Sequence, residues 1–511
     1  MSALSARDMQ RIEAAKPMPE SRAHLDAGKV ELLNRLAAEP VKAAFSPVVM
    51  AGLVRTAEFI LIVLTGAAVH QFYVAAYVGY QPSYFVVTAA VAILSVFVFQ
   101  ILQSYSLAAF HQPLRQIFRL CGGWAFVFLI VFAAMFFLKL DGVVSRVWIA
   151  SWFLAGIGVL AIERTILSRV TLRMAKAGRL ARRAVVVGGG EFGHDLLRTF
   201  GATKSPEISM LGVFDDRADD RSPLTVEGFP KLGNVDDLVE FARHTRIDLV
   251  IFALPITAEQ RILQMLRKLW VLPIDIRLAA HANRLRFRPR SYSYVGQVPV
   301  LDLLDKPIAD WDVVIKLAFD RIVGAIALLA LSPVFLATAI AVKLDSPGPV
   351  LFRQRRYGFN NELVEVYKFR SMYVDKTDAT AAKLVTRNDS RVTRVGRFIR
   401  KTSLDELPQL LNVVFKGNLS LVGPRPHAVH AKAADRQYDE VVDGYFARHR
   451  VRPGITGWAQ VNGWRGETDT QEKIQQRVEH DLYYIENWSI LFDLYILATT
   501  PLSLIKTKNA F

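Results

Sequence analysis

The sequence predicts a membrane protein that combines an α-helical N-terminal bundle of four spans, an α/β middle domain and an α+β C-terminal domain that dips into the membrane. Three observations support this fold class. Four apolar stretches lie close together near the N-terminus, a β-branched run leads directly into glycines near residue 185, and a fifth apolar run near residue 330 is interrupted by proline. The 511 residues suffice for about three domains of ordinary size.

Composition limits the classes of protein to which this chain can belong. Hydrophobic residues make up 52% and charged residues 22% of the chain, which excludes intrinsic disorder and argues against a fully soluble enzyme. The net charge of +16 favours anionic partners such as lipid headgroups, phosphates or nucleic acid. Because Cys121 is the only cysteine, disulfide frameworks and cysteine-based zinc sites are excluded.

The N-terminal part is predicted to cross the membrane four times. A polar leader over 1–47 lacks the apolar core of a secretory signal and precedes a transmembrane domain over 48–170. Each expected span approaches the ~20 residues that a helix needs to cross a bilayer. The spans are expected at 48–70, 84–103, 121–140 and 145–167. Buried core helices of a soluble protein are the alternative.

The distribution of positive charge predicts the orientation of these spans. The leader is rich in Lys and Arg, whereas the connection between the first two spans, residues 71–83, contains neither. Because Lys and Arg concentrate in cytoplasmic loops, the N-terminus is predicted to be cytoplasmic. Four crossings return the chain to the same side, so everything after about residue 170 begins in the cytoplasm.

A change in the character of the sequence near residue 184 predicts the α/β middle domain. The run AVVVGGGEFG contains a G-x-G-x-x-G pattern formed by Gly188, Gly190 and Gly193. Between a strand and a helix, such glycines let backbone amides approach a diphosphate. Asp215 follows the next strand, where a ribose-binding carboxylate would lie. We expect a Rossmann-like domain over 182–280 and a linker over 281–309; the domain either binds no ligand or holds a regulatory nucleotide or nucleotide sugar.

The fifth apolar run predicts a second contact with the membrane. This run covers residues 322–342 and is broken at its centre by Ser332 and Pro333. Proline removes a backbone donor and kinks a helix, and serine can bond a carbonyl that the kink frees. Since both flanks are basic, we interpret the segment over about 312–344 as a re-entrant helix that returns to the cytoplasmic side; a kinked transmembrane span is the alternative.

The C-terminal third is strongly basic and contains an isolated pair of carboxylates. Residues 346–401 hold 13 Lys and Arg against 5 Asp and Glu. Because these basic residues directly follow the fifth apolar run, we expect anionic lipids and phosphate-bearing substrates rather than nucleic acid. The adjacent Asp405 and Glu406 follow this region. Ser403 and Glu406 also match a capping box, which leaves a structural role for Glu406 open.

Five motifs in the last 200 residues carry a resemblance to a known family. They are DSPGPVLFRQRRYG (345–358), YKFRSM (367–372), TRVGRFIRKTSLDELPQLLNV (393–413), LSLVGPRP (419–426) and RPGITGWAQVNG (452–463). Residues 310–511 resemble the bacterial sugar transferases, which are monotopic phosphoglycosyl transferases. The whole chain resembles the large membrane-bound polyprenyl-phosphate hexose-1-phosphate transferases of the bacterial inner membrane. By analogy with them, a homodimer is favoured.

The resemblance implies a reaction and a role for the carboxylate pair. Members of the family transfer hexose-1-phosphate from a UDP-hexose to undecaprenyl phosphate and release UMP, an early step of exopolysaccharide, capsule or O-antigen synthesis. UDP-glucose or UDP-galactose is the expected donor. Asp405 corresponds to the nucleophile that forms a phosphosugar intermediate, and Glu406 to a ligand of Mg²⁺. The cations expected to bind substrate phosphates are Arg425, which is flanked by two prolines, together with Arg400, Lys368 and Arg370.

Other classes of protein fit the sequence less well. A regulatory membrane protein that senses a nucleotide and carries an inactive transferase module is the main alternative. A flippase would need more spans and more charged residues inside them than this chain has, and a sugar-nucleotide dehydratase would need a Tyr-x-x-x-Lys pair that is not found. The last apolar stretch, residues 482–505, contains Asp493 and is predicted to lie at the membrane interface rather than to cross it.

Overall fold

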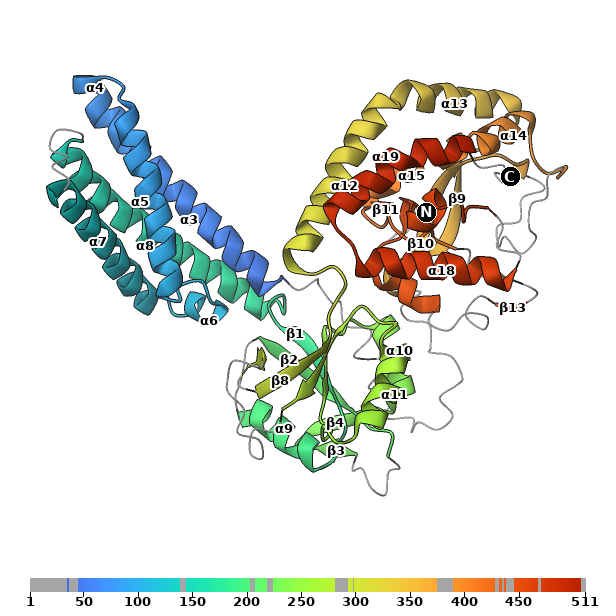
Figure 1. Cartoon of the computed structure of the whole chain (residues 1–511), viewed down its shortest axis with the longest axis horizontal. Helices are drawn as coiled ribbons and strands as arrows, with labels where there is room; N and C mark the ends of the chain where they lie inside the picture. Colours follow the sequence, from blue (N-terminus) through green and yellow to red (C-terminus); the bar gives the residue numbers. More distant parts are fainter. Residues whose placement is uncertain are drawn as a thin grey trace, which may run out of the picture. The chain divides into compact units, whose positions relative to one another are not determined.

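The computed structural model of the chain forms two compact units, which are described separately here (Figure 1). One unit is formed by residues 42–182, and the residues from Arg183 onward belong to the other. The structure describes residues 35, 45–137, 144–202, 207–217, 224–280, 293–296, 298–374, 389–427, 432–433, 436–437, 445–466 and 470–506. Most of the predicted polar leader over 1–47 therefore lies outside the described residues.

The N-terminal unit is helical, as the sequence predicts. Its helices are α3 (Pro47–Val69), continued by a π-helical turn (His70–Val74) into α4 (Ala75–Val78), then α5 (Pro82–Ile101), α6 (Leu107–Phe110), α7 (Pro113–Phe137) and α8 (Arg146–Lys176). Among the described residues, four helices are long and apolar enough to cross a membrane: 47–77, 82–101, 113–137 and 146–176. These four apolar helices confirm the predicted ones and fit a membrane protein.

Close packing and one buried ion pair hold this bundle together. A Cβ atom at Gly156 would lie 2.5 Å from the indole ring of Trp124, so the helices can approach there only because the residue is glycine. Arg164 Nη2 lies 2.5 Å from Glu58 Oε1, and the Tyr105 hydroxyl donates to Glu58 Oε2 at 2.6 Å. Charged groups inside a membrane bundle are tolerated when they are paired in this way.

The middle domain is a sheet covered by helices. Its strands are β1 (Arg182–Val187), β2 (Ile208–Phe214), β3 (Thr225–Val226), β4 (Phe229–Gly233), β5 (Leu249–Phe252), β6 (Asp275–Ala279), β7 (Ser293–Val295) and β8 (Val298–Leu304). They lie in the order β3-β4-β2-β1-β5-β6-β8-β7, in which β1, β5 and β6 pair in parallel, as do β2 and β4.

The alternation of side chains along β1 explains the two covered faces of this sheet. Val185 and Val187 pack toward α10 (Val235–His244) and α11 (Glu259–Leu269). Ala184 and Val186 pack on the opposite side, in the core that contains residues of α9 (Glu191–Ala202). Both sets are fully buried, which is why the strand is a continuous apolar run rather than an alternating one.

The predicted linker over 281–309 is wrong in its second half. Strands β7 and β8 pair antiparallel with each other, and β8 pairs antiparallel with β6, so the sheet continues to Leu304. Val298 and Val300 are buried in the core on the α9 side. Strands β7 and β8 at this end of the sheet contain only a few alternating apolar residues, which composition alone does not distinguish from a connecting segment. Residues 281–292 lie outside the described part of the chain.

The C-terminal domain starts with a bent pair of helices, α12 (Asp310–Ala330) and α13 (Ser332–Asp345), whose axes differ by 63° (Figure 1). The break lies at Leu331, next to the predicted Ser332 and Pro333. The elements that follow are β9 (Leu351–Tyr357), β10 (Leu363–Phe369), α14 (Arg394–Lys401), α15 (Gln409–Leu411), β11 (Ser420–Val422), β14 (Gly454–Thr456), α17 (Trp458–Val461), α18 (Gln471–Glu486) and α19 (Ile490–Lys506). Strands β9 and β10 form an antiparallel hairpin, and β11 pairs in parallel with β14.

A buried polar cluster joins α12 to α18, α19 and β11. Lys316 Nζ lies 2.5 Å from Asp493 Oδ2 and donates to the carbonyl of Val422 at 3.1 Å. The Tyr484 hydroxyl lies within hydrogen-bond distance of both Asp493 and the same carbonyl, and Asp320 accepts from the amide of Leu421. The apolar stretch predicted as one helix over 482–505 is divided between α18 and α19. The charge of its Asp493 is compensated by Lys316 inside the protein.

Removal of Lys316 tests this cluster. We expect Lys316→Met to destabilise the C-terminal domain by about 3–5 kcal/mol, because Asp493 loses its buried counter-charge. The thermal midpoint of the detergent-solubilised protein should fall clearly. Lys343→Met removes an exposed lysine from α13 whose ammonium donates to the carbonyl of Gly348. This variant serves as control and should leave the midpoint nearly unchanged. Equal midpoints for the two variants would contradict the assignment.

Candidate functional site

The predicted carboxylates lie on a tight turn after α14. This helix ends at Lys401, Ser403 adopts a left-handed conformation with φ 61°, and residues 404–406 form one 3₁₀ turn. The capping-box interpretation of Ser403 and Glu406 is wrong, since the Ser403 side chain caps no backbone amide. Its hydroxyl instead accepts a hydrogen bond from Arg465 Nη2. A non-glycine residue at positive φ is strained and marks a backbone that the surroundings hold in place.

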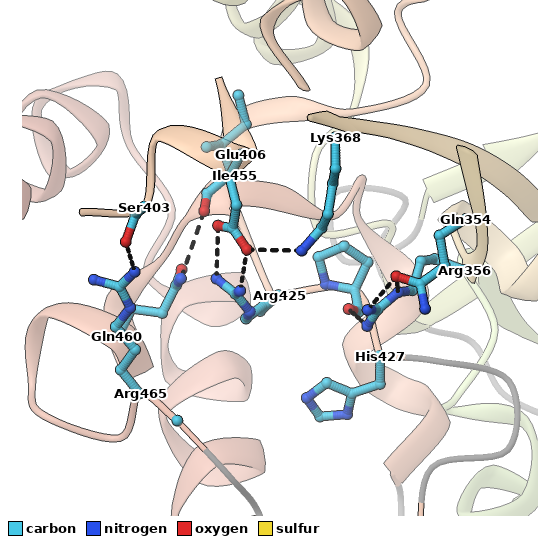
Figure 2. Close-up of polar contacts among 12 residues, drawn as sticks. Gln354, Arg356, Lys368, Ser403, Glu406, Arg425, His427, Ile455, Gln460 and Arg465 are labelled. Carbon is cyan, nitrogen blue, oxygen red and sulfur yellow. Dashed lines mark hydrogen bonds and ion pairs between the residues drawn. The ribbon is translucent and has the colours of Figure 1, made fainter. Parts of the chain in front are cut away.

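Glu406 is held by two cations from distant parts of the sequence. Figure 2 shows its carboxylate between Arg425 and Lys368. Arg425 Nη2 lies 2.5 Å from Glu406 Oε1 and Nη1 lies 3.3 Å from Oε2, while Lys368 Nζ donates to Oε1 at 2.9 Å. Burial by itself would raise the pKa of Glu406, but the charges of Arg425 and Lys368 outweigh it and hold the pKa well below its usual range. Glu406 is therefore ionised at any physiological pH.

Asp405, next in sequence, has a different environment. Among the described residues, its half-buried carboxylate has no hydrogen-bond or ion-pair partner. Burial raises the pKa of Asp405, and the charge of Glu406 raises it further, while Lys368, Arg400 and Arg425 lower it in part. Two adjacent carboxylates thus differ in character: one is tied into ion pairs, and the other is left available in a cationic surrounding.

The remaining predicted cations separate into two groups. Lys368, Arg425 and Arg400 all act on the carboxylate pair, by contact or by charge. Arg370 is directed elsewhere: its guanidinium donates to the carbonyls of Pro347 and of Ser346, the latter at 2.7 Å, just beyond the end of α13. In this structure Arg370 anchors the C-terminal end of α13 and does not contact Glu406.

Sequence reasoning missed Arg465, which also belongs to the site. Burial lowers the pKa of Arg465, and Arg425 lowers it further, whereas the charges of Glu406 and Asp405 raise it. It donates a hydrogen bond to Ser403, which precedes Asp405 by two positions in the sequence. Arg465 follows the RPGITGWAQVNG motif by only two positions, so the motif was the signal that could have directed attention to it.

For the predicted Mg²⁺, the site offers part of a ligand set, the two carboxylates Asp405 and Glu406. No group of three or more His, Cys, Asp or Glu side chains suited to a metal occurs in the part of the chain that the structure describes. Mg²⁺ nevertheless binds commonly through one or two carboxylates, with phosphate oxygens and water completing its shell. Glu406, which is permanently ionised, and the adjacent Asp405 fit that requirement. Such an ion would have to share Glu406 with Arg425 and Lys368.

In the predicted glycine-rich site of the middle domain, the carboxylate of Asp215 is already paired with an arginine. Gly188 has φ 107°, and a Cβ atom at Gly193 would clash with the carbonyl oxygen of Gly188, so these glycines permit a close strand-to-helix turn. Asp215 accepts from the amide of Gly189 at 2.8 Å and forms an ion pair of 2.6 Å with Arg217. A Cβ at Gly190 would lie 3.3 Å from that guanidinium. A ribose would have to displace Arg217 to reach Asp215.

Comparisons with known proteins place this site in a family. Residues 311–507 match the bacterial sugar transferases, and residues 100–280 match a family described as a CoA-binding domain. A UDP-glucose:undecaprenyl-phosphate glucose-1-phosphate transferase of Xanthomonas campestris pv. campestris is 33% identical over 464 residues, which are 90% of this chain and 94% of that protein. The chain belongs to the bacterial sugar transferase family.

Two further relatives differ in the sugar that their names state. A UDP-glucose:undecaprenyl-phosphate glucose-1-phosphate transferase of Escherichia coli (strain K12) is 38% identical over 367 residues, 72% of this sugar transferase and 76% of that protein. A UDP-N-acetylgalactosamine-undecaprenyl-phosphate N-acetylgalactosaminephosphotransferase of Aeromonas hydrophila is 44% identical over 199 residues, 39% of this chain and 44% of that protein. The family predicted from the motifs is confirmed.

The strained turn before the carboxylates can be tested in this sugar transferase by the residue at position 403. Ser403→Val should lower the thermal midpoint, because a β-branched residue in the left-handed region costs on the order of 1–3 kcal/mol. Ser403→Gly should lower it less, since glycine adopts this conformation freely. Both variants lose the hydrogen bond from Arg465, so the difference between them isolates the backbone strain. Equal midpoints would show that the turn is unstrained.

Proposed function

We propose that this sugar transferase transfers hexose-1-phosphate from a UDP-hexose to undecaprenyl phosphate, giving undecaprenyl-diphospho-hexose and UMP. The observation that carries the proposal is the adjacency of two unlike carboxylates. Asp405 has no ion-pair partner among the described residues, whereas Arg425 and Lys368 hold Glu406 in place. The names of the Xanthomonas and Escherichia coli relatives support the reaction and favour glucose as the sugar. The Aeromonas relative supports including an amino sugar among the donors to be tested.

The proposed chemistry proceeds in two displacements at one phosphorus atom. An oxygen of the Asp405 carboxylate attacks the phosphorus that bears the sugar, and the bond from this phosphorus to the bridging oxygen breaks. UMP departs with that oxygen, leaving an acyl phosphosugar on Asp405. A phosphate oxygen of undecaprenyl phosphate then attacks the same phosphorus and releases the free carboxylate. A covalent intermediate of this kind replaces one difficult transfer by two easier ones.

The cations around Asp405 supply the charge that this chemistry needs. Phosphoryl transfer depends mainly on positioning and on neutralising negative charge. Arg425 and Lys368 already face the carboxylate pair, and Arg400 lowers the pKa of Asp405, which favours the ionised nucleophile. We propose that Glu406 holds Mg²⁺, which would neutralise the phosphate groups of the donor and of the departing UMP.

The bent pair α12–α13 suits an enzyme whose acceptor is a lipid. Its outer side chains include Ile326, Leu329 and Leu336, each more than half exposed. Ser332 Oγ donates to the carbonyl of Leu329 at 2.7 Å, which satisfies one group at the break. We propose that this pair is re-entrant and holds the carboxylates at the level of the lipid phosphate. The catalytic domain would then lie on the cytoplasmic face of the bacterial inner membrane, which the N-terminal helices would cross several times.

The middle domain has a separate place in the proposal. Its parallel central strands and glycine turn support a Rossmann-like fold. Because Asp215 is already bound to Arg217, any nucleotide site at this turn would be regulatory and would require that ion pair to open. None of the residues proposed for catalysis comes from this domain.

Release of UMP tests the reaction directly. Detergent-solubilised protein is given a panel of UDP-hexoses with and without undecaprenyl phosphate and Mg²⁺. We expect repeated UMP release with one sugar to depend on lipid and Mg²⁺, with at most one UMP per protein when the lipid is omitted. Both signals should be lost in Asp405→Asn, because the amide is no nucleophile. Asp312→Asn, an exposed carboxylate in the first turn of α12, serves as control and should keep activity. UMP release from no sugar by folded protein would favour a regulatory protein with an inactive transferase module.

The acidic limb of the pH profile tests the state of Asp405. Activity should fall as the pH falls through the pKa of Asp405, since only the ionised form attacks. The Lys368 charge lowers this pKa, so Lys368→Met should raise it and move the acidic limb of kcat/KM to higher pH. Lys401→Met, an exposed lysine at the end of α14, should leave the limb in place. An unmoved limb in Lys368→Met would remove Asp405 as the titrating group.

A further inference from the structure

Behind the carboxylate site, a buried arginine holds the segment that carries Arg425. Arg448 comes from the 3₁₀ helix over 445–450 and has no exposed surface. Its Nη2 donates to the backbone carbonyl of Arg425 at 2.7 Å and to Asp481 Oδ2 at 2.6 Å. The Arg448 guanidinium thus holds the main chain of Arg425, whose side chain faces Glu406. A planar guanidinium is suited to binding two acceptors at once because its donors have fixed directions.

A second buried arginine holds the segment that carries Arg465. Arg477 projects from α18, and its Nη2 donates to the carbonyl of Trp464 at 2.7 Å and to that of Gly466 at 3.0 Å. Its Nε also donates to the carbonyl of Trp464 at 3.0 Å. The two carbonyls flank Arg465 on both sides in the sequence. Arg465 in turn donates to Ser403, two residues before Asp405.

The two buried arginines meet at one histidine. Arg448 Nη1 lies 2.6 Å from His427 Nδ1, and Arg477 Nη1 lies 3.3 Å from His427 Nε2. Burial and the neighbouring guanidinium groups hold the pKa of His427 well below its usual range, so the imidazole is neutral and can accept from one of them. Asp481, also buried, supplies the negative charge through its ion pair with Arg448. We call these four side chains, His427, Arg448, Arg477 and Asp481, the rear cluster.

We propose that Arg448 and Arg477 are positioning residues for phosphoryl transfer, each fixing the backbone of one of the two arginines, Arg425 and Arg465, that face the carboxylate pair. The inference rests on the proposed function, because it assigns the rear cluster to that same site. Two cations that arrive from different loops must be set to within a fraction of an ångström to stabilise one transition state. The rear cluster fixes both loops from a single buried centre.

A positioning role makes a specific demand on kinetics. Arg477→Lys keeps the charge, but an ammonium cannot reproduce the fixed fork that spans both carbonyls, so the loop that carries Arg465 gains freedom. Misplacement of a positioned group by about 1 Å can cost up to about a hundredfold in rate. We therefore expect Arg477→Lys and Arg448→Lys each to lower kcat/KM for the UDP-hexose by about tenfold or more.

Arg450→Lys is the matched control for the single variants. Arg450 lies two residues after Arg448 on the same 3₁₀ helix, is also buried, and donates to a carbonyl, but that carbonyl belongs to Asp305. It should keep near-normal kcat/KM while lowering the thermal midpoint as much as the other two substitutions. A loss of activity in Arg450→Lys equal to theirs would show that a structural defect explains all three and would overturn the proposal.

A double-mutant cycle supplies the decisive readout. If Arg477 acts through Arg465, the effect of Arg477→Lys should shrink to less than about twofold when Arg465→Lys is already present. Equal losses in both backgrounds would overturn the positioning role. Where Arg477→Lys lowers the thermal midpoint beyond that of Arg450→Lys, the cycle is run with Arg477→Gln, whose amide can still donate to one carbonyl, and the same two outcomes decide.

These results separate the inference from the function on which it rests. Wild-type protein that releases UMP, together with additive cycles, would remove the rear cluster from the mechanism and leave the proposed reaction intact. Wild-type protein that releases no UMP from any UDP-hexose would overturn both. UMP release that depends on Asp405, with a non-additive cycle and a near-normal Arg450→Lys, is the result that supports both.

Discussion

The double ion pair of Glu406 with Arg425 and Lys368 is the interaction on which the arrangement of this site depends. It joins three elements that are far apart in sequence: strand β10, the 3₁₀ turn over 404–406 and the segment after β11. Because Glu406 satisfies the two cations, its neighbour Asp405 remains without a partner among the described residues. The proposed role of Asp405 as nucleophile needs that freedom. Glu406, by contrast, could be separated from its cations only at a cost of several kcal/mol.

Two buried polar centres place these elements with respect to the rest of the domain. Lys316 on α12 binds the carbonyl of Val422, three residues before Arg425, and so ties this segment to the bent helix pair α12–α13. Arg448, on the 3₁₀ helix over 445–450, binds the carbonyl of Arg425 itself. A loop that would otherwise be free is thus fixed at two carbonyls by buried cations. Each of these cations is in turn compensated by a buried aspartate, Asp493 or Asp481.

Several features could be predicted because they depend on local patterns. Runs of apolar residues of bilayer length indicated the four helices, and a β-branched run before glycines indicated β1 and the turn after it. The carboxylate pair was identified through motifs, and two of its cations, Lys368 and Arg425, are in contact with Glu406. The errors concern interactions between distant residues: Ser403 bonds Arg465 instead of a helix amide, and strand β8 pairs with β6 where a linker was expected.

By itself the sequence determined the membrane character and the family, and it directed attention to the two carboxylates, because hydrophobic length and short motifs are recorded in consecutive residues. Only the tertiary structure decided which carboxylate is bound and which is available, that Arg370 anchors α13, and that Arg465 joins the site. Those outcomes depend on which charges lie within a few ångströms after folding. Coulombic and hydrogen-bond energies fall steeply with distance and rise with burial, and neither quantity can be read from spacing along the chain.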